Sequence, residues 1–68
     1  MSYEIKTEYL EEGDVILFAD LEDTITRIGA VDGVARRIDV IRNGPGIKDA
    51  DAWFYTGVEA EHTVRRTR

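Results

Sequence analysis

The chain contains no cysteine, which excludes a disulfide framework and a thiolate zinc site as supports for its fold. Its only histidine, His62, and its only serine, Ser2, give no basis for a Ser-His-Asp or Cys-His catalytic arrangement. No apolar run approaches the roughly 20 residues that a membrane-spanning helix needs. The first residues show no basic stretch followed by an apolar segment, so we expect no signal peptide and a cytoplasmic protein.

Basic residues are also scarce. Nine Lys and Arg stand against 14 Asp and Glu, which gives a formal net charge of −5 and disfavours binding to DNA or membranes by bulk attraction. With 68 residues the chain forms one small domain, residues 1–68, whose core is thin. A pocket of roughly 300 Å³ or more would hollow out that core. We therefore expect no large enclosed active site, no enzyme activity and no cofactor.

Six glycines and one proline separate short apolar runs, which is typical of an all-β chain. Alternation predicts a half-exposed strand over residues 3–7, and the apolar run 15–19 predicts a strand covered on both faces, with a turn at Gly13 between them. The pair Asp32-Gly33 is typical of a type I′ hairpin turn between strands over 24–31 and 34–42.

Imperfect alternation in this hairpin predicts a bulge near residues 35–36 or a kink at Gly29. The remaining predicted elements are an acidic loop over 20–23, a turn over 43–46, a polar segment over 47–52, an aromatic strand over 52–56, at most a 3₁₀ turn near 58–62 and a basic strand over 63–68. An alternative interpretation makes residues 47–55 a helix packed on a small sheet.

The run Leu10-x-x-Gly13-Asp14-Val15-Ile16 resembles the start of SH3-like small barrels. The elements after it add to the likeness: a long hairpin, a further strand, and, within residues 57–64, a tight turn with a short last strand. The resemblance implies an all-β fold, a small SH3-like barrel of five to six bent antiparallel strands. The chain lacks the acidic and aromatic pattern with which SH3 domains bind proline-rich peptides, so that ligand is not implied. It is also similar in general composition to short proteins of actinobacteria and their phages. Such a fold hosts many functions and implies no chemistry.

Charge is distributed unevenly along the chain. Residues 1–23 hold eight acids and one base, whereas residues 63–68 hold three arginines, Arg68 included, and no acid. We expect the two termini to pair as adjacent strands, which brings these opposite charges together. An alternative interpretation is an acidic patch that mimics nucleic-acid phosphate and inhibits a DNA-binding partner. Its residues are Glu11, Glu12, Asp20, Glu22 and Asp23.

Three consecutive aromatic residues carry the leading functional hypothesis. On a strand they cannot all face the core, so we expect Phe54 to face inward and Trp53 and Tyr55 to face outward. An outward aromatic pair, together with Arg37, would anchor a partner. The sequence therefore favours a non-enzymatic protein-interaction module that binds another protein or itself, as a homodimer.

The alternative hypothesis is a small barrel that binds nucleic acid through an arginine and aromatic face. Its residues are Arg36, Arg37, Arg65 and Arg66. His62 with Glu59 and Glu61 suggests a metal site, but no second histidine or cysteine is available to set the geometry of a transition metal. We therefore expect no metal site.

Overall fold

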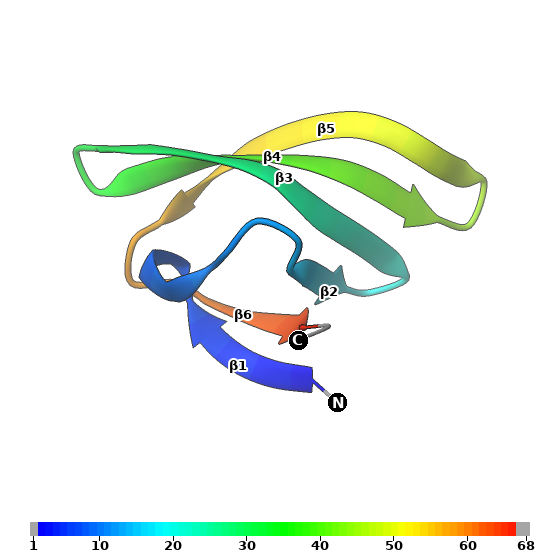
Figure 1. Ribbon diagram of the computed structural model, residues 1–68, viewed down its shortest axis with the longest axis horizontal. Helices are drawn as coiled ribbons and strands as arrows, with labels where there is room; N and C mark the ends of the chain where they lie inside the picture. The colour runs from blue at the N-terminus through cyan, green and yellow to red at the C-terminus, as the bar shows by residue number, and fades with distance from the viewer. Residues whose placement is uncertain (1, 67–68) are drawn as a thin grey trace.

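The computed structural model describes residues 2–66 and contains six antiparallel strands in one sheet, in the order β1-β6-β2-β3-β4-β5 (Figure 1). The elements are β1 (Ser2–Lys6), a 3₁₀ turn η1 (Thr7–Tyr9), β2 (Val15–Phe18), β3 (Leu21–Asp32), β4 (Ala35–Gly44), β5 (Ile47–Gly57) and β6 (Glu61–Arg65). The predicted all-β fold of five to six bent antiparallel strands is confirmed. Arg68 lies outside the described residues.

The sheet folds over itself but does not close. β3, β4 and β5 arch over β2, β6 and β1, and the two layers are joined where β2 pairs with β3 (Figure 1). Strands β1 and β5 have one neighbour each, so they are the two edges. The molecule is thus an incomplete barrel with an open side between its layers.

The core lies between the two layers. Ile16 of β2 is in register with Val64 of β6, and Ile25 of β3 is in register with Val40 of β4. These four side chains are buried, as is Ile38, which is 0% exposed. Ile38 and Val40 therefore share the inward face of β4.

The β3–β4 ladder bends at two register shifts, between Ile25 and Arg27 and between Ile28 and Val31. The second shift contains Gly29, as predicted, where an added Cβ would lie 3.3 Å from the carbonyl oxygen of Arg37. Glycine therefore allows the close approach of the two strands at the bend. On β4 the same shift lies between Arg36 and Ile38, next to the alternative position near residues 35–36, and the extra residue belongs to β3.

Two predicted turns are displaced. The hairpin turn is Gly33-Val34, with a positive φ of 68° at Gly33 alone, which is the pattern of type II′ rather than type I′. Val34 is β-branched and avoids positive φ, which explains the difference. The acidic loop over 20–23 is also wrong. Its turn is only Ala19-Asp20, with Ala19 at φ 52°, and β3 begins at Leu21.

The polar segment over 47–52 and the alternative helix over 47–55 are both wrong, because β5 runs continuously from Ile47. The predicted turn before it is present, with Gly46 at φ 74° after Pro45, the arrangement of a type II turn. The 3₁₀ turn lies at residues 7–9, not near 58–62. Among residues 2–66 no helix has the length and apolar character needed to cross a membrane.

Candidate protein-binding face and adjoining groove

The outer face of β4 and β5 carries three residues that we call the aromatic patch: Arg37, Trp53 and Tyr55. Register pairs Arg37 with Tyr55, and Asp39 with Trp53, so all four side chains project from the same face. Trp53 is 55% exposed and Tyr55 is 57% exposed. Phe54 points to the opposite face and packs against the core. The predicted division of the three aromatic residues is confirmed.

Direct contacts hold the aromatic patch in one arrangement. The Trp53 and Tyr55 rings meet edge to face, with centroids 5.7 Å apart. The Arg37 guanidinium lies 4.3 Å from the centroid of the Trp53 ring. Arg37 also donates from Nε and Nη2 to Asp39 Oδ1, at 3.2 and 3.1 Å. Because the rings are already ordered, a partner that contacts them loses little side-chain entropy at this surface.

The aromatic patch lies beside a free strand edge. β5 is 11 residues long and has no neighbour beyond β4. Exposed charges occupy its first half, at Lys48, Asp49 and Asp51, and such charges discourage pairing with another strand. Residues 52–57 contain no charged side chain. This second half of the edge is therefore open to strand addition.

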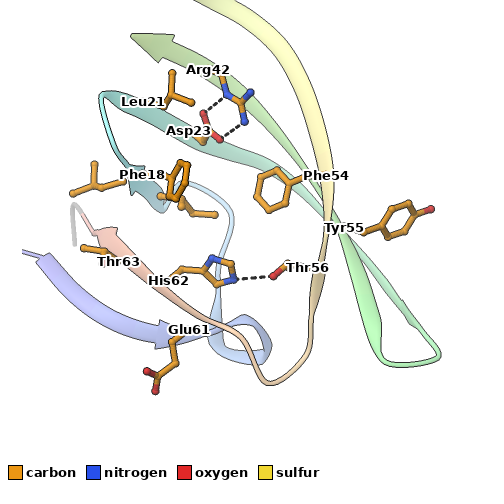
Figure 2. Close-up of a pocket in the computed structure, with 12 residues that line it drawn as sticks. Phe18, Leu21, Asp23, Arg42, Phe54, Tyr55, Thr56, Glu61, His62 and Thr63 are labelled. Atoms are coloured by element: carbon orange, nitrogen blue, oxygen red, sulfur yellow. Dashed lines mark hydrogen bonds and ion pairs between the residues drawn. The ribbon is translucent and has the colours of Figure 1, made fainter.

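A groove of about 460 Å³ opens between the two layers (Figure 2). Phe18 and Phe54 project toward each other across it, and Leu21 lies at its rim, whereas the Tyr55 ring points away. Phe18 is 72% exposed, although the run 15–19 predicts a strand covered on both faces. The space is an open groove rather than an enclosed site, because the unclosed sheet leaves space between its layers.

An ion pair forms one wall of the groove. Arg42 donates from Nε and Nη2 to the two carboxylate oxygens of Asp23, both at 2.8 Å. The Asp23 side chain is 6% exposed and that of Arg42 is 30% exposed. The hydrogen bond to Asp23 raises the pKa of Arg42. This pair was not predicted, although alternation places Asp23 on the same face as Leu21 and Ile25.

His62 lies at the opposite end of the groove. Its Nε2 is 3.0 Å from Thr7 Oγ1 and 3.1 Å from Thr56 Oγ1, and the Thr7 hydroxyl donates to the carbonyl oxygen of Gly57 at 2.8 Å. Burial lowers the pKa of His62, so the ring is neutral at pH 7. The part of the chain that the structure describes contains no group of three or more His, Asp or Glu residues that could hold a metal ion.

The four arginines of the nucleic-acid hypothesis do not form one surface. Arg36 and Arg37 are neighbours on β4 and project to opposite faces. Arg65 pairs with Glu22 at 3.3 Å, and Arg66 pairs with the buried Asp14 at 2.8 Å.

These two ion pairs neutralise Arg65 and Arg66 within the fold. They fit the expected meeting of the oppositely charged chain ends, which is confirmed by the pairing of β1 with β6.

The acidic residues of the phosphate-mimic hypothesis are also separated. Glu11 and Glu12 precede β2 and Asp20 follows it, so they lie at opposite ends of that strand. Glu22 is ion-paired and Asp23 is buried.

Comparisons of the chain with protein-family models, curated proteins and solved structures gave no match.

Proposed function

We propose that this chain is a non-enzymatic protein-interaction module that binds a partner protein through the aromatic patch. One observation carries the proposal: Trp53 and Tyr55 each expose more than half of their surface while being held in place by each other and by Arg37. Trp, Tyr and Arg are the residue types enriched at the energetic centres of protein interfaces. The proposal includes action in the cytoplasm and an SH3-like fold for the incomplete barrel.

The charges support a protein partner over nucleic acid. Arg37 is the only arginine of the four proposed for nucleic-acid binding that projects from the aromatic patch, and Asp39 neutralises it. A face that binds single strands needs several free cations beside its stacking rings. The aromatic patch offers two rings and a neutralised cation, which suits a protein surface.

Site-specific photo-crosslinking tests the proposal in cells of the organism that encodes the chain. The crosslinking residue p-benzoylphenylalanine replaces Tyr55 in one variant and Tyr9 in a matched control, because Tyr9 is 65% exposed but lies on η1. We expect a protein adduct at position 55 only, and its loss when Trp53→Ala is added. Equal adducts at both positions, or none at position 55, would contradict the proposal.

The mass of the adduct identifies the class of partner. An adduct of twice the chain mass indicates a second copy, and sedimentation equilibrium of the purified chain then gives a dimer. Any other mass indicates a different protein. If Trp53→Ala and Tyr55→Ala change neither the oligomeric state nor the captured partners while circular dichroism shows an intact fold, the aromatic patch is not the binding surface.

A further inference from the structure

We infer that the partner contributes an extended segment, apolar at alternate positions and basic elsewhere, which pairs with the free edge of β5 and fills the groove between the layers. This inference rests on the proposed function and specifies the chemistry of the partner. It adds a second contact surface, the groove, to the aromatic patch.

The geometry of β5 joins the two surfaces. Trp53 and Tyr55 face outward, whereas Phe54 and Thr56 face the groove. A strand paired with β5 continues this alternation, so its outward side chains lie beside the aromatic patch and its inward side chains lie over the groove. One extended segment therefore contacts both surfaces, and its backbone bonds the free edge of residues 52–56, before Gly57, whose carbonyl oxygen already accepts from Thr7.

The groove favours apolar side chains in the inward positions. Phe18 is 72% exposed although it faces Phe54 across the groove. The polar groups of the groove walls are already satisfied, because Asp23 and Arg42 neutralise each other and His62 bonds two threonines. An inward apolar side chain would bury Phe18 and leave no ion without its partner.

The outer face of β5 favours basic side chains in the outward positions of the segment. Asp49 and Asp51 precede Trp53 at every second residue, so they project from the same face as the aromatic patch, and both are exposed. On β6, the exposed Glu61 adjoins the groove. A basic segment meets these acids on a chain of net charge −5. A second copy is less suited, because its own β5 would bring Asp49 and Asp51 to the same face.

The test uses two synthetic nine-residue probes, one of alternating valine and lysine and one of alternating valine and glutamate. Each is titrated into the uniformly ¹⁵N-labelled full chain, and amide hydrogen exchange is followed by NMR. We expect the valine-lysine peptide to slow exchange at alternate amides of residues 52–56, because strand pairing protects every second amide of an edge. The valine-glutamate peptide is expected to bind at least ten-fold more weakly.

Three variants locate the contacts. Phe18→Ala removes an exposed ring of the groove and is expected to weaken binding about ten-fold. Glu61→Gln is expected to weaken binding about three-fold at low salt, and the matched Glu12→Gln, in the exposed loop before β2, is expected to leave it unchanged. Circular dichroism confirms that each variant is folded.

Several outcomes overturn the inference. The inference is wrong if millimolar valine-lysine peptide does not slow amide exchange in β5. It is also wrong if the valine-glutamate peptide binds equally well, or if Phe18→Ala leaves the affinity for the valine-lysine peptide unchanged. Protection of β5 that depends on the concentration of the chain alone assigns the edge to a second copy and also overturns it. If crosslinking at Tyr55 still succeeds in any of these cases, the proposed function stands and only the strand-addition inference fails.

Discussion

Adjacent acidic residues on β3 allow a matched test of how the ion pair in the groove wall stabilises the fold. Asp23 and Glu22 each pair with an arginine, but the Asp23 side chain is 6% exposed and that of Glu22 is 50% exposed. Asp23→Ala removes two charge-assisted hydrogen bonds of 2.8 Å and leaves Arg42 without its counter-ion. Breaking a fully buried pair costs about 3–5 kcal/mol.

Arg42 is 30% exposed and regains water in the variant, so we expect a loss of about 2–3 kcal/mol for Asp23→Ala. Glu22→Ala breaks a solvent-exposed pair and is expected to cost less than about 1 kcal/mol. A chain of 68 residues has a free energy of unfolding of about 3–10 kcal/mol. The Asp23 variant therefore loses a large part of its stability, whereas the Glu22 variant does not.

Urea denaturation at pH 7, followed by far-ultraviolet circular dichroism, measures both variants. Trp53 fluorescence is a poor probe here because the side chain is already more than half exposed in the folded protein. A third variant, Arg42→Met, keeps an apolar stem but leaves the Asp23 carboxylate charged and without its counter-ion. Because Asp23 is less exposed than Arg42, this variant is expected to lose at least as much stability as Asp23→Ala. Equal losses for Asp23→Ala and Glu22→Ala, within about 0.5 kcal/mol, would refute the reasoning from burial.

Three further predictions follow from local geometry. Burial lowers the pKa of His62 in the folded state, so the unfolded chain binds the proton more readily and stability falls as the pH drops below about 6.5. The urea midpoint is therefore expected to be lower at pH 5.5 than at pH 7.5. The variant His62→Gln is expected to remove this difference. Gly44→Ala would place its Cβ 2.8 Å from Leu21 Cδ2 and 3.1 Å from the Asp20 carbonyl oxygen, so we expect a loss of about 1–3 kcal/mol in the same urea assay. Gly57→Ala, whose nearest contact is 3.8 Å away, is expected to lose less. Trp53→Ala is expected to change the free energy of unfolding by less than about 1 kcal/mol, since its side chain lies on the outer face; a larger loss would show that the residue supports the fold.

The period-two pattern of side chains was sufficient to predict the faces of the aromatic part of β5. It separated Phe54 from its two aromatic neighbours, because consecutive strand residues alternate whatever the rest of the chain does. The β5 segment from Ile47 to Asp51 was missed for the converse reason. Its charged residues have low strand propensity, and only pairing with β4 makes it a strand.

The groove and its ion pair depend on contacts that local pattern does not contain. Asp23 is buried because the β3–β4 register places it opposite Arg42, 19 residues away. That register depends on the turn at Gly33 and on two shifts between the strands, so no short window of sequence specifies it. Ala19 adopts a left-handed conformation that a non-glycine residue seldom takes, which is why the β2–β3 turn is shorter than its acidic composition suggested.

The hydrogen bonds around Thr7 explain why the space between the layers is open at one end. Thr7 donates to Gly57, and His62 bonds both Thr7 and Thr56, so η1, β5 and β6 are tied together at this end. No comparable bond between described residues joins β5 to β2 at the other end, where Phe18 is exposed. A fold that is fixed at one end and open at the other keeps its apolar groove without collapsing onto it. The same arrangement leaves the edge of β5 accessible beside the aromatic patch, so the features that prevent closure of the barrel also create the surface that we propose for binding.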